Sequence, residues 1–131
     1  MPNNKKHILI TGGAGFIGSN FIPFFIHKYN NYHIINLDKL TYAGELSNLS
    51  AIENSNTYTF VKGDICDKKL VKFLFKKYEI NHVIHFAAES HVDNSINSPE
   101  AFINTNVVGT FNLLDVAREF WMESPFKFKK G

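Results

Sequence analysis

The stretch HILITGGAGFIGSNF, residues 7–21, decides the fold class of this chain. Its first part, residues 7–11, is a short apolar run with β-branched isoleucines, which predicts a strand buried on both faces. Glycines follow at positions 12, 13, 15 and 18, and from residue 16 the apolar side chains recur at helical spacing. A strand, a glycine-rich turn and a helix in this order predict a dinucleotide-binding turn.

The glycines have different expected roles in such a turn. Gly12 turns the chain sharply, Gly15 lets the backbone approach a pyrophosphate, and Gly18 lets the helix pack closely on the strand. The N–H groups and the positive end of the helix dipole then face the phosphates. The spacing is Gly-x-Gly-x-x-Gly when read from Gly13 and Gly-x-x-Gly-x-x-Gly when read from Gly12, and the sequence leaves both readings open.

A second predicted strand, over residues 33–37, leads directly into Asp38. This acid comes about 20 residues after the last glycine, where a carboxylate binds the ribose hydroxyls of the adenosine half of a dinucleotide. A carboxylate at this place repels the 2′-phosphate of NADP. The sequence therefore predicts NAD as the cofactor.

Composition limits the class of protein. The 131 residues suit one domain, 1–131, and 44% hydrophobic with 20% charged residues allow a buried core. A net charge of +2 gives no reason to expect a nucleic-acid partner. Cys66 is the only cysteine, which is typical of a reducing compartment, and no apolar run has the length of a membrane span. We expect a cytoplasmic protein with no membrane partner.

Predicted strands and helices alternate along the rest of the chain. The expected elements are a helix near 16–29, a short helix at 46–53, a strand at 58–64, a helix at 67–78, a strand at 82–88 and a long helix from Pro99 to about Met122, with Ser98 as N-cap. The lysines at 68, 69, 72 and 76 are expected on a solvated face. This alternation predicts an α/β fold, a Rossmann-like doubly wound parallel sheet with strand order 3-2-1-4.

Such a sheet has further strands beyond the fourth. The last residues, FKFKKG (126–131), leave room for only a stub of an edge strand, so we expect the sheet to be incomplete in this chain.

Five motifs occur in the order and spacing of the extended short-chain dehydrogenase/reductases: TGGAGFIGSN, NLDKLTYAG, VKGDICD, FAAESHVDNSI and INTNVVGT. The chain resembles this family from about residue 6 to residue 122, which is roughly the N-terminal third of the family's length. DKLTYAG together with AAESHVDNSI is most similar to the dTDP-glucose 4,6-dehydratases rather than to the epimerases. The resemblance implies an NAD-dependent lyase that converts dTDP-glucose to dTDP-4-keto-6-deoxyglucose, a step in deoxysugar and rhamnose precursor synthesis.

The resemblance also implies which residues bind the cofactor. They are Gly12, Gly15, Phe16, Ile17 and Gly18 at the pyrophosphate; Asp38, Lys39, Leu40 and Thr41 at the adenosine ribose; Asp64 and Ile65 at the adenine; Phe86, Ala87, Ala88, Glu89 and Ser90 at the nicotinamide ribose; and Thr105 at the cofactor region. Ser90 is also the candidate for contact with the sugar nucleotide. Glu89 and His91 are only two metal-type ligands in one loop, so no metal site is expected.

The family's catalytic residues are expected outside these 131 residues. The family's catalytic motifs are Thr-Asp-Glu and a helical Tyr-x-x-x-Lys. The chain has no Thr-Asp-Glu, and its only match to Tyr-x-x-x-Lys is Tyr58 to Lys62. In a strand these four residues span about 13 Å instead of the ~5.4 Å of a helical turn, so the lysine cannot approach the tyrosine hydroxyl. We therefore expect the cofactor-binding half of the enzyme and an isolated chain that is inactive.

Two other functions remain open. The chain is then either a non-catalytic dinucleotide-binding module or part of another nucleotide-sugar dehydratase or epimerase. For the family, the resemblance implies a homodimer through the helix near 99–122, and the apolar residues of this helix lead us to expect that the isolated chain dimerises or aggregates.

Overall fold

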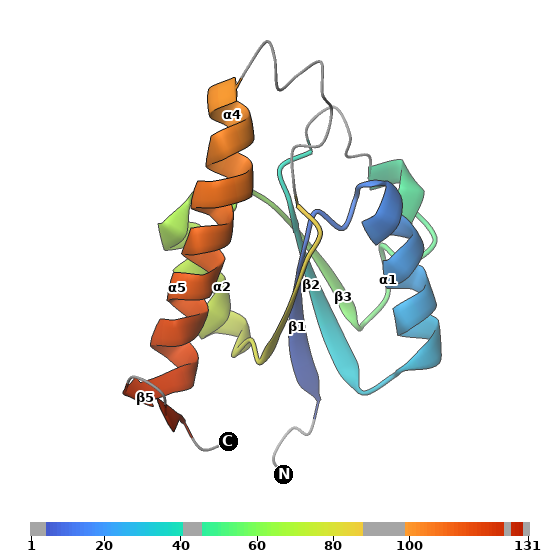
Figure 1. Ribbon diagram of the computed structural model, residues 1–131. Coiled ribbons are helices and arrows are strands. Elements are labelled where there is room, and N and C mark those ends of the chain that lie inside the picture. The colour runs from blue at the N-terminus through green and yellow to red at the C-terminus, as the bar shows by residue number, and fades with distance from the viewer. Residues whose placement is uncertain (1–4, 41–45, 88–98, 125–126, 130–131) are drawn as a thin grey trace. The chain divides into compact units, whose positions relative to one another are not determined.

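The computed structural model describes residues 5–40, 46–87, 99–124 and 127–129 (Figure 1). Contacts group the chain into two compact units. Unit 1 comprises residues 1–64 and 80–87 and contains the parallel sheet, whereas unit 2 comprises residues 65–79 and 88–131 and contains the long helix.

Unit 1 is built on a parallel sheet of four strands. These are β1 (Lys6–Thr11), β2 (Tyr32–Asp38), β3 (Tyr58–Lys62) and β4 (His82–His85), in the order β3-β2-β1-β4. The predicted order 3-2-1-4 and the Rossmann-like fold class are confirmed. The register pairs Ile10 with Asn36 and places the carboxyl ends of β1 and β2 side by side. The predicted phosphate-binding turn starts at this end of the sheet.

The core of unit 1 lies between the sheet and helix α1 (Phe16–Lys28), which runs alongside the sheet in Figure 1. Ile22 of α1 is fully buried in one cluster with Ile8, Ile10 and Ile34. The short helix after β2 is a 3₁₀ helix, Leu46–Leu49, so the predicted helix over 46–53 is too long. Residues 50–54 continue as turns with bonds between residues three apart, because serine and asparagine side chains in this segment favour turns over an α-helix.

Unit 2 contains helix α2 and a long helical segment of three parts. Helix α2 (Lys68–Tyr78) begins at Asp67, whose side chain accepts a hydrogen bond from the N–H of Leu70. The long segment consists of α4 (Pro99–Ile103), a π-helical part (Asn104–Gly109) and α5 (Thr110–Trp121). The expected helix near 99–122 is therefore present in extent, but a π turn interrupts its regular hydrogen bonding.

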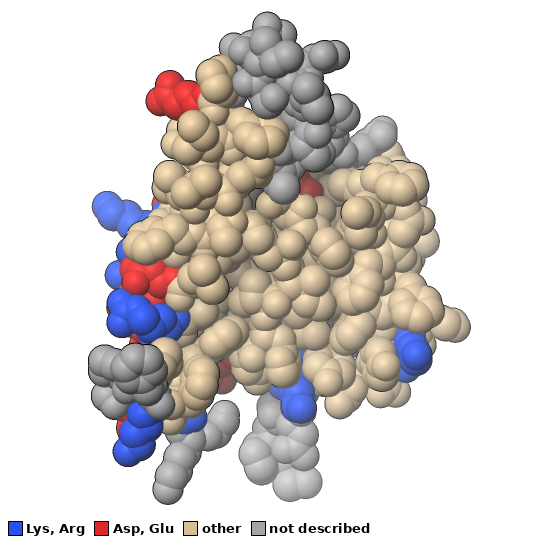
Figure 2. Space-filling model, viewed as in Figure 1, with Lys and Arg blue, Asp and Glu red and all other residues tan. Residues whose placement is uncertain are grey.

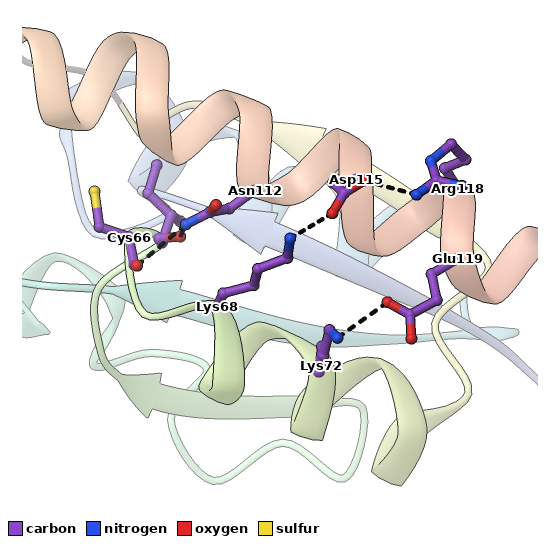
Figure 3. Close-up of polar contacts among 8 residues, drawn as sticks. Cys66, Lys68, Lys72, Asn112, Asp115, Arg118 and Glu119 are labelled. Atoms are coloured by element: carbon purple, nitrogen blue, oxygen red, sulfur yellow. Dashed lines mark hydrogen bonds and ion pairs between the residues drawn. The ribbon is translucent and has the colours of Figure 1, made fainter.

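Two of the lysines expected on a solvated face of α2 point at α5 instead (Figure 3). Lys68 bonds Asp115, and Lys72 lies 3.2 Å from Glu119. The apolar Phe73 of the same helix has 55% of its surface exposed. The helical period was right, but α2 is rotated so that Val71, Leu74 and Phe75 are its buried residues and the lysines flank the contact with α5.

The last described residues form a separate antiparallel ribbon. Strand β5 (Met122–Ser124) pairs with β6 (Lys127–Phe128), so the expected edge-strand stub of the parallel sheet is wrong. On the face drawn in Figure 2, basic and acidic side chains are interspersed over the helical part of unit 2. None of the helices in the described ranges is long and apolar enough to cross a membrane.

Candidate functional site

The turn after β1 depends on a glycine at position 12. Gly12 has φ +69°, in the left-handed region that side chains disfavour. A Cβ atom at this position would lie 2.6 Å from the Ala87 backbone nitrogen. The N–H of Gly12 donates to the Leu37 carbonyl over 2.9 Å, so the turn starts where the β1–β2 ladder ends.

Gly15 and Gly18 differ in what surrounds them. A Cβ at Gly18 would lie 2.6 Å from the Gly13 Cα, so helix α1 can approach the turn only if residue 18 is glycine. A Cβ at Gly15 would meet only the Gly12 carbonyl oxygen, at 3.4 Å, which is an ordinary contact. Among the described residues, position 15 is thus less crowded than position 18, and a ligand could approach the backbone there. A Cβ at Gly13 would lie 2.2 Å from Asn36 Oδ1, so both readings of the glycine spacing fit these surroundings.

The N-cap residue of helix α1 has no side chain that could bond the first backbone N–H groups of the helix. Its N-cap is Gly15, and no acidic residue lies in the first turn. Unpaired N–H groups and the positive dipole end make such a terminus suitable for an anion. Phe16 and Ile17, the first two residues of the helix, are both largely exposed, Phe16 by 84%.

Asp38 lies next to this turn. Its Oδ2 accepts a hydrogen bond from the Ala14 N–H over 2.9 Å, and its Oδ1 accepts from the Leu40 N–H over 2.8 Å. Each carboxylate oxygen has a further lone pair, so Asp38 can also accept bonds from the hydroxyls of a ligand. Lys39 forms an ion pair with Asp64 at 3.2 Å, which brings together two residues expected at the adenosine half of the cofactor.

Asn36 and Tyr58 also hold the turn, although the motifs in the sequence do not predict either of them as a site residue. Asn36 is fully buried; its Oδ1 accepts from the Gly13 N–H and its Nδ2 donates to the Tyr58 oxygen, both over 3.0 Å. Burial raises the pKa of Tyr58 above its usual value. The signal in the sequence is a polar residue in an otherwise apolar strand, two positions before Asp38.

The chain after β4 is fixed to the end of β1. The Phe86 N–H donates to the Thr11 carbonyl over 2.9 Å, and the Ala87 N–H donates to Thr11 Oγ1 over 3.3 Å. The Phe86 ring contacts Phe21 of α1 edge-on, with ring centroids 5.5 Å apart. The same Thr11 hydroxyl bonds His85 Nδ1 at 2.5 Å, and burial lowers the pKa of His85. Phe86 and Ala87 thus lie directly beside the glycine turn.

Among the described residues, two predicted site residues belong to unit 2, Ile65 and Thr105. Ile65 is buried against Gly109. A Cβ atom at position 109 would lie 2.4 Å from Ile65 Cδ1, so the Ile65 side chain occupies that space. Thr105 lies half-buried in the π-helical part, a type of segment that is frequent at functional sites. Thr41, Ala88, Glu89 and Ser90 lie outside the described residues. Within the described ranges, no three His, Cys, Asp or Glu side chains form a group that could hold a metal ion.

A family model described as GDP-mannose 4,6 dehydratase matches residues 9–130. The chain belongs to this family. Among curated members, the dTDP-glucose 4,6-dehydratase of Salmonella typhimurium is 54% identical over 114 residues, which are 87% of this chain and 31% of that protein. The Haemophilus influenzae dTDP-glucose 4,6-dehydratase is 49% identical, over 88% of this chain and 34% of its own length. The chain thus spans about a third of the curated relatives that it matches.

Solved structures agree with this membership. The dTDP-glucose 4,6-dehydratase of Streptomyces venezuelae, solved with NAD bound, has a TM-score of 0.79 and 42% identity, covering 87% of this chain and 36% of that one. The UDP-glucose 4-epimerase of Thermotoga maritima has a TM-score of 0.76 and 32% identity, covering 87% and 34%. The resemblance expected from the sequence is confirmed, with higher identity to these dehydratases than to this epimerase.

Proposed function

We propose that this chain is the NAD-binding portion of a dTDP-glucose 4,6-dehydratase, which forms dTDP-4-keto-6-deoxyglucose. One observation carries the proposal: the Asp38 carboxylate bonds the glycine turn that leads into an uncapped helix terminus. A carboxylate beside such a terminus supports the proposal, because it can accept from ribose hydroxyls while the terminus binds a diphosphate. Identities of about half the aligned residues to dTDP-glucose 4,6-dehydratases support the choice of substrate.

The described residues fit a dinucleotide. A diphosphate would lie against the backbone at Gly15 and accept from the first N–H groups of α1, those of Phe16 and Ile17. Asp38 accepts from the adenosine ribose, while its negative charge disfavours the 2′-phosphate of NADP. NAD, when bound, supplies the acceptor and donor of hydride for a reaction in which hydride leaves sugar C4, water is lost across C5–C6 and hydride returns to C6. In that reaction the residues of this chain bind NAD and orient it.

The full proposed set of cofactor-binding residues follows the sequence prediction. It comprises Gly12, Gly15, Phe16, Ile17, Gly18, Asp38, Lys39, Leu40, Thr41, Asp64, Ile65, Phe86, Ala87, Ala88, Glu89, Ser90 and Thr105, with Ser90 also at the sugar nucleotide. We place the proposed enzyme in the cytoplasm, because a chain with one cysteine suits a reducing compartment.

Titration calorimetry with NAD tests the cofactor assignment. The wild-type chain should bind NAD and prefer it to NADP, whereas Gly15→Val should abolish binding because its side chain fills the space left for the diphosphate. A Cβ at position 15 would meet the Gly12 carbonyl oxygen at 3.4 Å, an ordinary contact, so this variant should keep its thermal stability. A wild-type chain that gives neither heat nor a thermal shift with NAD would falsify the assignment.

Turnover of dTDP-glucose separates the proposed enzyme from a non-catalytic module. The 131 residues alone should form no 4-keto-6-deoxy product, because they hold no Tyr-x-x-x-Lys in a helix. The reading frame beyond residue 131 should encode that motif, and the longer chain should form the product. An open reading frame without it would favour the binding module.

We further propose that the enzyme is a homodimer through the long helix of unit 2. Its side chains Ile103, Val107, Phe111 and Leu114 are each more than half exposed and recur at intervals of four, four and three residues. Such a spacing forms one apolar stripe on a helix, which suits pairing with another helix. Light scattering should report a dimer that Leu114→Glu dissociates, whereas the matched control Phe24→Glu, an exposed residue of α1, should not. A monomeric wild-type chain at micromolar concentration contradicts this assembly.

A further inference from the structure

We propose that Asn36 and Tyr58 are positioning residues for the diphosphate-binding turn: the tyrosine hydroxyl holds the asparagine amide in place by a hydrogen bond, and the amide fixes Gly13. The inference rests on the proposed NAD site and adds two residues to it. Both side chains belong to strands of unit 1, Asn36 to β2 and Tyr58 to β3.

The hydrogen bonds allow only one orientation of the Asn36 amide. Its Oδ1 accepts from the Gly13 N–H over 3.0 Å, and its Nδ2 donates to the Tyr58 oxygen over 3.0 Å. The opposite orientation would place the NH₂ group against the Gly13 N–H, two donors facing each other. The Gly13 N–H, which can only donate, thus selects the orientation, and the Tyr58 hydroxyl gives the Asn36 NH₂ group its acceptor and holds the amide in place.

Gly13 is matched to this amide. A Cβ at Gly13 would lie 2.2 Å from Asn36 Oδ1, so any side chain there would displace the acceptor. The φ angle of Gly13 is not in the left-handed region. Position 13 requires glycine because a Cβ atom has no room there. The pairing explains why a fourth glycine follows Gly12 although the fingerprint needs only three.

Together with Asp38, Asn36 continues the β1–β2 ladder beyond its last backbone bond. The Gly12 N–H bonds the Leu37 carbonyl, and the next two N–H groups of the turn bond side chains of β2, Asn36 at Gly13 and Asp38 at Ala14. Residues two apart on a strand point to the same side, so β2 holds two successive residues of the turn. Asn36 is fully buried and cannot touch a ligand; its effect on binding must pass through the turn.

Tyr58→Phe tests this inference with the smallest change. The variant keeps the ring in the core and leaves the buried Asn36 NH₂ without its acceptor. We expect the Kd for NAD and for ADP to rise about tenfold, because the turn is no longer held in one geometry. Adenosine, which lacks the diphosphate, should bind the variant and the wild type equally.

The matched control is Ile34→Val. Ile34 is fully buried on β2 in the same cluster, and its aliphatic side chain cannot hydrogen-bond the turn. This variant should lower thermal stability to a similar degree and leave the Kd for ADP unchanged. The positioning role is refuted if Tyr58→Phe binds ADP and NAD with wild-type affinity. It is also refuted if Ile34→Val loses as much affinity for ADP and NAD as Tyr58→Phe does. In both cases the proposed NAD site stands.

Amide hydrogen exchange in the ligand-free protein gives a second readout. The Gly13 N–H and the Asn36 side-chain NH₂ should exchange slowly in the wild type, and Gly13 should exchange faster in Tyr58→Phe. Fast exchange of both groups in the wild type overturns the inference even if the variant does not fold. If the wild type binds no NAD, the proposed function fails. If the Gly13 N–H exchanges at the same rate in Tyr58→Phe as in the wild type, the positioning role of Asn36 and Tyr58 fails.

Discussion

Gly12→Ala is the sharpest test of the turn geometry, because two separate costs add at this position. An alanine at φ +69° has a left-handed backbone, which costs about 1–2 kcal/mol for a residue with a Cβ. The new methyl group would also lie 2.6 Å from the Ala87 nitrogen and 2.7 Å from its Cα, both backbone atoms that cannot rotate away. Overpacking of this kind typically costs about 1–3 kcal/mol. The free energy of unfolding should therefore fall by about 2–5 kcal/mol.

Urea unfolding measures this loss directly. The midpoint should drop while the m-value stays unchanged, because the same surface is exposed on unfolding. Gly15→Ala is the matched control in the same turn: its φ is −74° and its nearest contact would be 3.4 Å away. Its free energy of unfolding should change by less than about 1 kcal/mol, but it should weaken NAD binding.

The two variants separate folding from binding. If Gly12→Ala unfolds at the wild-type urea midpoint, the backbone of Ala87 does not lie against the turn at Gly12. Equal loss of stability in both variants would show that Gly15 is needed for folding and not for a ligand. Unaltered NAD affinity in Gly15→Ala would place the diphosphate elsewhere.

Three further changes test other parts of the structure. Hydrogen bonds from Lys68, and then from Arg118, lower the pKa of Asp115 to about 2. The contribution of this carboxylate to stability should therefore be lost as pH falls from about 4 towards 2, and the melting temperature of Asp115→Asn should depend less on pH over this range. Asn112→Ala should lower the free energy of unfolding by about 1–3 kcal/mol in urea, since its amide bonds two backbone carbonyls before α2. Burial, then neighbouring positive groups, lowers the pKa of His33 below 6.5, so stability should fall as pH drops below 6.5, less so in His33→Gln.

The parallel sheet could be predicted from the sequence because each strand carries its own signal. Short β-branched runs separated by glycine turns and helical patterns define strand and helix without any knowledge of their partners. Connection rules then restrict the strand order, and the observed order agrees. The terminal ribbon was missed because pairing of β5 with β6 depends on two short segments whose composition does not distinguish a ribbon from an edge strand.

The lysines of α2 show what a helical period cannot reveal. The pattern separates polar from apolar faces, but it does not show whether a neighbouring helix carries charges opposite the polar edge. Here Asp115 and Glu119, four residues apart on α5, match Lys68 and Lys72, four residues apart on α2 (Figure 3). A search for acidic and basic pairs at equal helical spacing would have raised this pairing as a hypothesis.

Residues of the candidate site could be predicted where the backbone conformation or the strand spacing requires a particular residue type. They could not be predicted where a side chain positions another residue of the site. Gly12 and Asp38 follow from the turn and from strand spacing, and both lie at the turn as expected. Asn36 needed one more step: a polar side chain in a buried strand must find a partner, and its position two residues before Asp38 places it on the same side of β2. The same reasoning changes the meaning of Tyr58, whose spacing to Lys62 imitates a catalytic pair. In β3 its hydroxyl accepts from Asn36, so the hydroxyl serves the geometry of the turn and not proton transfer.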